Sequence, residues 1–164
     1  MIQVSLREAT AEDVPALVAV IHAGFEEYRG RLDPSSGAHG ESEETIRQKL
    51  TVARAVLASV NQQVVGCVFY EPKGDHVYLG RLAVLPAYRR QGIARELIAW
   101  VERQALSLGY TRVRLGVRVA LPGNRAYFER LGYRVLNYGT HAGYAEPTYV
   151  NLEKEVTQES VPLQ

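Results

Sequence analysis

The segment "YRRQGIARELI", residues 88–98, combines residue types that could bind a phosphate group. Arg89 and Arg90 carry fixed positive charges with several hydrogen-bond donors each, which suits a doubly charged pyrophosphate. Gly92 has no side chain to keep a ligand off the backbone, and the unpaired N–H groups at a helix N-terminus favour an anion. The segment predicts a phosphate-binding turn, with a solvated helix start as the alternative interpretation.

The composition excludes several classes of partner. The chain has 164 residues, with 19 Lys and Arg against 18 Asp and Glu. This balance gives no general electrostatic attraction to nucleic acid or to an anionic membrane, although Arg112, Arg114 and Arg118 share one side of a predicted strand. The motifs G-x-x-x-x-G-K-[ST] and G-x-G-x-x-G do not occur, so ATPase and dinucleotide-binding functions lose their main support. We expect neither a nucleic-acid nor a membrane partner.

The cysteine and the histidines indicate little metal or redox chemistry. Cys67, in the apolar run "VVGCVFY", is interpreted as a buried small hydrophobe, and a single cysteine fits a reducing compartment. The four histidines are not spaced as a metal-ligand set, so no metal is expected. The N-terminal residues "MIQVSLREAT" show no signal-peptide pattern, and no window approaches the ~18 apolar residues of a membrane span. We expect a cytoplasmic protein.

The predicted turn joins a strand to a helix. Residues 76–86 read as a strand that Pro86 closes, and Gly109 ends a helix over 93–108. Apolar residues recur along that helix at spacings of three and four, at Ile93, Leu97, Ile98, Val101, Ala105 and Leu108. The turn therefore lies at the N-terminus of the helix.

The remaining elements follow from the same patterns. Two strands lie within 55–72 and join at Asn61 and Gln62, and three consecutive antiparallel strands are expected. The other predicted strands are 2–8, 112–119 (Val113, Leu115, Val117 and Val119 on one face), 133–138 and 148–154, and the other helices are 10–24, 42–53 and 124–131. The loop 30–41 is too rich in Gly, Pro and Ser for regular structure. We expect an α/β (α+β) fold in a single domain, residues 1–164, with a core over about 2–153 and a frayed tail at 156–164.

Two blocks of the chain resemble the GNAT (Gcn5-related) N-acetyltransferase superfamily. "LAVLP" followed by "YRRQGIA" is similar to that family's signature R/Q-x-x-G-x-G/A, at Arg89, Arg90, Gln91, Gly92, Ile93 and Ala94. "NRAYFERLGYRV" resembles the family's second block, and the element order fits from about residue 2 to residue 153. The resemblance implies a GNAT-type domain: a central mixed, mostly antiparallel sheet of about seven strands, splayed in the middle and flanked by about four helices.

The resemblance also implies an acetyl-CoA site between the strand ending at Leu85 and the strand 112–119. The backbone at Leu82, Ala83 and Val84 would pair with the pantetheine arm, and the Arg89–Ala94 turn would take the pyrophosphate. Asn124 would approach the pantetheine or the thioester end, with a helix N-cap as its alternative role. Tyr127 and Phe128 would line the site.

Amine acetylation needs a base, oxyanion stabilisation and an acid. The family's usual acid is the second residue of the aromatic pair, which is Phe128 here, so Tyr127 is the candidate. A helix turns about 100° per residue, so a side chain at 127 does not point in the same direction as one at 128. The resemblance places Tyr78 where the family often has a glutamate base. His76 lies two residues earlier on the same face, and imidazole titrates near neutral pH. His141 lies on a loop that borders the acceptor pocket in such folds, and a backbone N–H near Val84 could serve the oxyanion.

The expected function is transfer of an acetyl group from acetyl-CoA directly to a primary amine of a small molecule. Peptide or protein N-termini and lysines are alternative acceptors, and a catalytically weak acyl-CoA-binding sensor is an alternative of another class. The acidic residues Glu26, Glu27, Asp33, Glu41, Glu43 and Glu44 would attract an amine, unless they form only a solvated face. A homodimer is left open.

Overall fold

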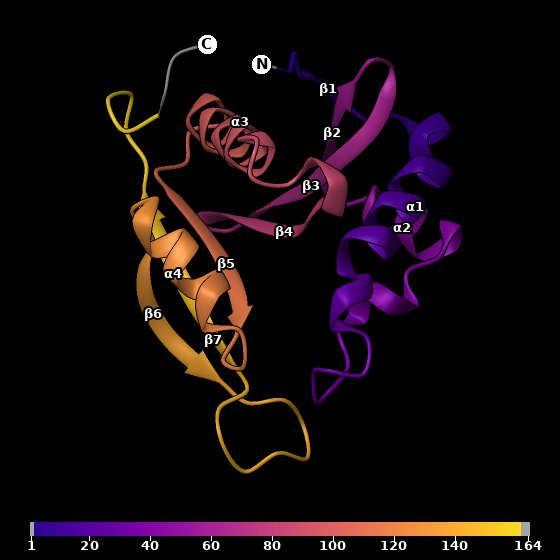
Figure 1. Cartoon of the computed structure of the whole chain (residues 1–164). Coiled ribbons are helices and arrows are strands. Elements are labelled where there is room, and N and C mark those ends of the chain that lie inside the picture. The colour runs from indigo at the N-terminus through magenta and orange to yellow at the C-terminus, as the bar shows by residue number, and fades with distance from the viewer. Residues whose placement is uncertain (1, 162–164) are drawn as a thin grey trace. The chain divides into compact units, whose positions relative to one another are not determined.

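The computed structural model describes residues 2–161, which form one seven-stranded sheet with the order β1-β2-β3-β4-β5-β7-β6 (Figure 1). The strands are β1 (Ser5–Glu8), β2 (Arg54–Val60), β3 (Gln63–Lys73), β4 (His76–Val84), β5 (Arg112–Arg118), β6 (Arg134–Gly139) and β7 (Tyr149–Glu155). The α-helices are α1 (Val14–Phe25), α2 (Glu43–Lys49), α3 (Ile93–Ser107) and α4 (Pro122–Arg130). The predicted fold class and the predicted order of elements are confirmed.

The chain divides into two compact units. Unit 1 contains the described residues up to Glu71 together with Leu79–Val101, and unit 2 contains Pro72–Tyr78 and the described residues from Glu102 onward. Strand β4 and helix α3 therefore each contribute residues to both units. The single domain expected from the sequence stays a prediction.

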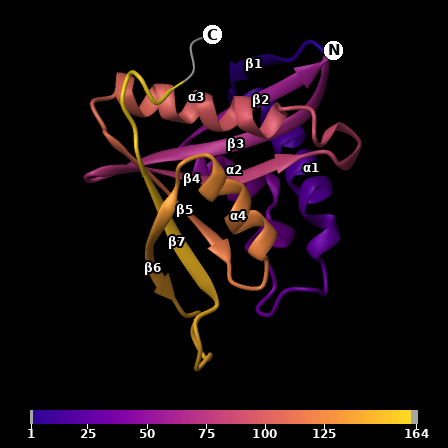
Figure 2. The same cartoon turned by 60° about the vertical axis from the view of Figure 1, so that its left-hand side comes forward.

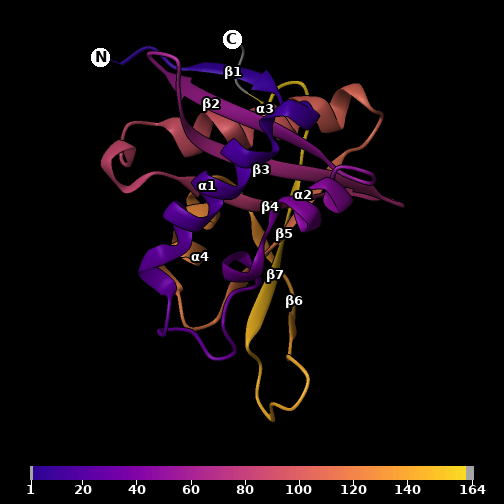
Figure 3. The ribbon, with the colours of Figure 1, turned by 90° about the vertical axis from the view of Figure 1, so that its right-hand side faces the viewer.

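Unit 1 has helices on both faces of its strands (Figure 3). Helices α1 and α2 cover one face, and their core residues are Val14, Leu17, Val20, Ile21, Ala38, Ile46, Ala55, Leu57, Cys67, Phe69 and Ala83. The first turns of α3 lie on the other face, where a Cβ added to Gly66 would be 3.3 Å from both Ile93 and Leu97. A glycine at position 66 thus lets α3 approach the backbone of β3 closely.

Several element boundaries in unit 1 differ from the predicted ones. The helix expected from residue 10 opens with a 3₁₀ turn, Ala11–Asp13, where Asp13 accepts a hydrogen bond from the Thr10 amide at 2.8 Å. The helix expected to reach residue 53 ends at Lys49, because turns follow it before β2 begins. The loop 30–41, expected to be irregular, contains a 3₁₀ turn at Gly37–Gly40.

Unit 2 is built on the antiparallel strands β5, β7 and β6, with α4 beside them (Figure 2). The β4–β5 ladder is parallel, with Val77 opposite Val113 and Tyr78 opposite Arg114. The buried residues of β5 are Val113, Leu115 and Val117, as the alternation predicts. Two apolar residues predicted to face inward are more exposed, Val119 at 44% and Leu108 at 40%, because both follow the last residue of their element.

A buried polar group in unit 2 joins α3, β7 and the segment between α4 and β6. Glu102, 2% exposed, accepts a hydrogen bond from the Tyr133 hydroxyl at 2.9 Å and pairs with Lys154 Nζ at 3.0 Å. Burial and the adjacent Glu102 charge raise the pKa of Tyr133 well above its ordinary value. Within the tail predicted to fray, Val156 and Val161 are buried and residues 157–160 between them are exposed. Residues 162–164 of that predicted tail lie outside the described residues.

Candidate active site

The turn between β4 and α3 has the backbone geometry of an anion site. Arg90 and Gly92 adopt left-handed conformations, with φ of +61° and +84°, and α3 begins at Ile93. The first N–H groups of an α-helix have no partner within the helix and carry the positive end of its dipole. A Cβ added to Gly92 would meet no atom within 4 Å, so space is open beside these N–H groups. The turn can therefore receive a phosphate group on its backbone.

Arg89 forms hydrogen bonds with other residues of unit 1. Its guanidinium donates to the Gly24 carbonyl oxygen at 2.8 Å, to the Val84 carbonyl oxygen at 3.3 Å and to the Glu27 carboxylate. These bonds connect the end of α1 with the end of β4. Arg90 is exposed on the same turn, where its side chain can add positive charge.

The β4 residues expected at the pantetheine arm lie directly before this turn. Ala83 is buried in the unit 1 core, while Leu82 and Val84 are partly exposed. A Cβ on Gly24 would be 2.9 Å from the Ala83 Cβ and 3.3 Å from the Val84 amide nitrogen. Gly24, which the sequence marked only as the end of a helix, is required for this close approach of α1 to β4.

Asn124 and Tyr127 share a face of α4 in unit 2, since they are three residues apart. Because α4 begins at Pro122, Asn124 lies inside the first helical turn and the alternative role of N-cap is wrong. Phe128 is 8% exposed, with its ring 5.7 Å from that of Tyr133. The Tyr127 ring is partly exposed and lies edge-on to Phe128 at 5.5 Å. The two aromatic residues therefore occupy different environments.

His76 and Tyr78 lie on the same side of β4, with the buried Val77 between them. His76 Nδ1 is 2.8 Å from the Asp75 carboxylate, and this hydrogen bond lowers the pKa of Asp75. The Tyr78 hydroxyl lies beside the backbone of β5, where a Cβ added to Gly116 would be 3.4 Å away. A carboxylate next to the imidazole fixes the orientation of His76, as a base would require.

His141 is held in the loop between β6 and β7 of unit 2. Its backbone N–H donates to Thr148 Oγ1 at 2.9 Å, and its ring Nδ1 is hydrogen-bonded to the same hydroxyl. The ring lies edge-on to Tyr149 at 5.1 Å. Tyr149 in turn covers Gly139, where a Cβ would be 2.1 Å from the tyrosine ring. The sequence marked His141 as a candidate but gave no sign of its contact with Thr148.

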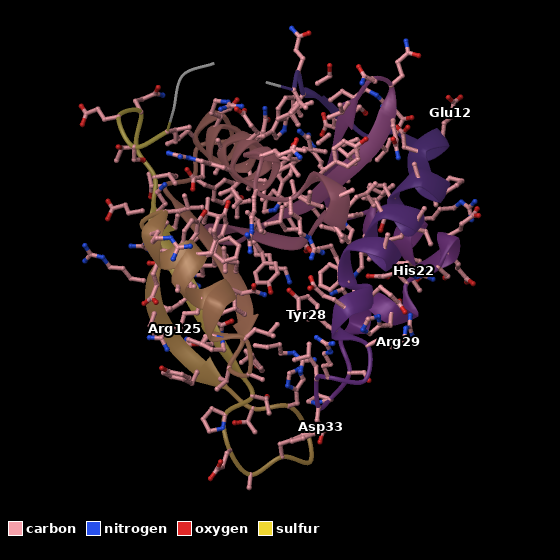
Figure 4. The ribbon with its side chains drawn as sticks, viewed as in Figure 1. Glu12, His22, Tyr28, Arg29, Asp33 and Arg125 are labelled. Carbon is pink, nitrogen blue, oxygen red and sulfur yellow. The ribbon has the colours of Figure 1, made fainter. Side chains whose placement is uncertain are left out.

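The acidic residues expected to attract an amine are largely paired with basic groups of the chain. The pairs are Glu26 with Arg29, Glu27 with Arg89, Glu41 with Arg81 and Lys49, and Glu43 with Arg47. In Figure 4 Tyr28 and Arg29 follow α1, and Asp33 lies in the loop beyond them. The free negative charge of this region is therefore smaller than the sequence alone suggests.

The basic face of β5 is partly neutralised too. Arg114 Nε lies 2.6 Å from the Glu153 carboxylate, and Arg112 Nη1 lies 3.5 Å from the Asp75 carboxylate. Arg112 and Arg114 therefore have acidic partners within unit 2.

Residues 2–161 contain no group of three or more His, Cys, Asp or Glu side chains placed to hold a metal ion. Over the same range, no helix is both long enough and apolar enough to cross a membrane.

The structure thus has a seven-stranded sheet and, between β4 and α3, a turn that contains Arg89, Arg90 and Gly92. Residues 21–133 match the Acetyltransferase (GNAT) family, and the chain belongs to this family.

Curated relatives agree with this assignment. The chain is 33% identical over 104 residues to Probable N-acetyltransferase 14 of Danio rerio, an alignment that covers 62% of this chain and 36% of the relative. It is 32% identical over 83 residues to the protein of the same name from Xenopus tropicalis, covering 49% of this chain and 40% of that protein. The chain thus spans well under half the length of the curated relatives it matches.

Solved structures share the fold. The PaiA N-acetyltransferase of Thermoplasma acidophilum, in complex with coenzyme A, has a TM-score of 0.79 at 17% identity, covering 93% of this chain and 99% of the other. A GNAT family acetyltransferase of Elizabethkingia anophelis with acetyl-CoA bound has a TM-score of 0.71 at 21% identity, covering 93% and 98%. The ribosomal-protein-S18-alanine N-acetyltransferase of Escherichia coli has a TM-score of 0.74 at 18% identity, covering 95% and 96%.

Proposed function

We propose that this protein transfers the acetyl group of acetyl-CoA to a primary amine of a small molecule. The observation that carries the proposal is the turn of unit 1, where the left-handed Gly92 leaves open space beside the N-terminus of α3. That turn lies within the part of the chain that matches the GNAT family. Relatives with this fold have coenzyme A or acetyl-CoA bound, which supports the choice of donor.

The residues of unit 1 would bind the donor. The backbone N–H groups at the start of α3 would hold the pyrophosphate, and Arg90 would add positive charge. The main chain of Leu82, Ala83 and Val84 would pair with the pantetheine arm as a strand pairs with its neighbour. Because these contacts use main-chain groups, they depend on the shape of β4 more than on its side chains.

The residues of unit 2 would carry the proton transfers. In the reaction, the amine nitrogen bonds to the thioester carbon, the carbon–sulfur bond breaks, and coenzyme A leaves as a thiolate. A base removes the proton from the attacking ammonium, and an acid protonates the thiolate. His141 is our candidate base, because in the tautomer whose Nδ1–H donates to Thr148 Oγ1 the other ring nitrogen, Nε2, can take a proton. Tyr127 is the candidate acid, with His76 and Tyr78 as alternatives for the base.

The first test is a calorimetric titration with acetyl-CoA, with coenzyme A and ATP as comparison ligands. We expect micromolar binding of acetyl-CoA and no binding of ATP. The second test follows release of the free thiol from acetyl-CoA across a panel of small amines, polyamines and peptides. Turnover on a small amine supports the proposal, and absence of acetyl-CoA binding contradicts it.

The candidate base is identified with two matched histidine variants. His141→Gln and His76→Gln each remove one imidazole, and loss of a general base lowers kcat by about 10²- to 10⁴-fold. We expect this loss, together with loss of the low-pH limb of the rate profile, in His141→Gln only. The reverse pattern would assign the base to His76.

One observation favours a second candidate, an acyl-CoA-binding module without efficient catalysis. Phe128 stands where the family's acid is expected, and it is buried against Tyr133. If the protein is such a module, the wild type should bind acetyl-CoA tightly, and neither the wild type nor Phe128→Tyr should release the free thiol. Robust turnover of any amine or peptide by the wild type would exclude it.

A further inference from the structure

Arg81, within β4, has an unusual backbone conformation. Its φ is +49°, and among the described residues it is the one non-glycine position inside a strand with a positive φ. L-residues adopt this region at an energetic cost and remain there only where surrounding contacts hold them. Arg81 directly precedes Leu82, where our proposed function places the pantetheine arm.

The contacts that hold Arg81 come from a buried carboxylate. Glu41, with a side chain only 4% exposed, accepts a hydrogen bond from Arg81 Nε at 2.7 Å. Its other oxygen accepts from the Thr45 hydroxyl at 2.6 Å, and Lys49 Nζ lies 3.4 Å away. Burial would raise the pKa of Glu41, but the hydrogen bonds and positive charges around it outweigh burial and lower that pKa. Glu41 is therefore a fully partnered carboxylate.

Two further contacts involve the guanidinium and the carbonyl of Arg81. A Cβ added to Gly37 would be 2.8 Å from Arg81 Nη2, so a glycine at position 37 lets the guanidinium lie close against the 3₁₀ turn at Gly37–Gly40. The Arg81 carbonyl oxygen accepts a hydrogen bond from the Cys67 thiol at 3.5 Å. The side chain and the carbonyl of Arg81 are thus both fixed within unit 1.

We propose that Glu41 is a positioning residue, whose ion pair with Arg81 holds β4 in the shape that presents the Leu82 backbone to acyl-CoA. This inference rests on the proposed function. When the charge of Glu41 is lost, the guanidinium, which is 27% exposed, can move into solvent. Arg81 then returns to the common extended region, and the N–H and C=O groups of the next residue change direction.

The test separates loss of the ion pair from loss of the backbone conformation at residue 81. Glu41→Gln removes the charge, and we expect it to weaken acetyl-CoA binding by about tenfold or more, as loss of a charged hydrogen bond does. Glycine adopts a positive φ without strain. We therefore expect Arg81→Gly to bind within about threefold of the wild type, and the double variant Glu41→Gln/Arg81→Gly to recover the affinity that Glu41→Gln loses. The matched control is Glu43→Gln. Glu43 lies two residues after Glu41, and its substitution breaks an exposed ion pair with Arg47, so it should leave the affinity for acetyl-CoA unchanged.

A ligand-free readout separates this inference from the proposed function. The Cys67 thiol contacts the Arg81 carbonyl, so its rate of alkylation reports the conformation of β4 without acetyl-CoA. We expect faster alkylation in Glu41→Gln than in the wild type and Glu43→Gln, and slow alkylation again in the double variant.

Each outcome decides one of the two claims. Wild-type affinity and wild-type alkylation in Glu41→Gln would overturn the positioning role. A double variant that binds as weakly as Glu41→Gln would also overturn it, because the backbone conformation alone would then not be enough. A wild type that does not bind acetyl-CoA refutes the proposed function, whatever the alkylation rates show about Glu41.

Discussion

Replacement of Gly92 by alanine separates the strain of the turn from its use as a binding site. Gly92 has φ +84°, and an L-residue in this left-handed region costs about 1–2 kcal/mol. A Cβ at this position meets no protein atom within 4 Å, so no steric cost is added in the ligand-free protein. We expect Gly92→Ala to lower the free energy of unfolding by about 1 kcal/mol.

The effect of Gly92→Ala on ligand binding should be larger. The added methyl group occupies the space beside the N-terminal N–H groups of α3, where the proposed pyrophosphate is bound. Loss of one hydrogen bond to a charged group amounts to about 1.5–3 kcal/mol, which corresponds to about 10- to 100-fold in Kd. Gly92→Val should bind no better and should lose more stability, because a β-branched residue is more strained at a positive φ.

Gly109→Ala is the matched control. Gly109 follows the other end of α3, has φ +89°, and also has no atom within 4 Å of an added Cβ. Both alanine variants should therefore unfold at similar, slightly lower denaturant concentrations, while only Gly92→Ala weakens acetyl-CoA binding in calorimetry. Equal affinities in the two variants would refute the assignment of the turn as a phosphate site.

Three further predictions follow from charges and burial. Arg89→Ala should destabilise the protein by about 1–3 kcal/mol in chemical denaturation, since it leaves carbonyl oxygens without their donor, whereas Arg90→Ala should weaken acetyl-CoA binding with little change in Tm. The hydrogen bond from Arg7 holds the pKa of Asp13 at about 2, below its ordinary 3.8, so its stabilisation is present above about pH 4 and lost as the pH falls through about 2. Asp13→Asn should therefore cost about 1 kcal/mol at pH 7, a value discounted because Arg7 is 57% exposed, and almost nothing at pH 2, as measured by urea denaturation. Burial raises the pKa of Cys67 to about 12, so iodoacetamide should modify the native protein at pH 8 far more slowly than the urea-unfolded chain.

The sequence predicted correctly the elements whose residue pattern repeats over short distances along the chain. The helix 93–108, the strand 112–119 and the hairpin at Asn61 and Gln62 all have patterns that repeat within a few positions, and each forms within a residue or two of its predicted bounds. The predictions were less accurate at ends and in loops. The helix predicted to reach residue 53 stops at Lys49, and the loop 30–41 contains a turn around the buried Ala38. In both places packing against the rest of unit 1 replaces a local signal.

The sequence alone determined the family and the location of the turn, because the signature Arg89–Ala94 and the helix after it are contiguous in the chain. Only the tertiary structure decided how the charges are used. Arg89 pairs with Glu27, 62 positions away, and Arg81 pairs with Glu41, 40 positions away. No periodic pattern connects residues so far apart, since only folding brings the two groups of such an ion pair together. For this reason the sequence did not indicate that Arg89 also bonds to Glu27, and Glu41 resembled one more acidic residue of a loop.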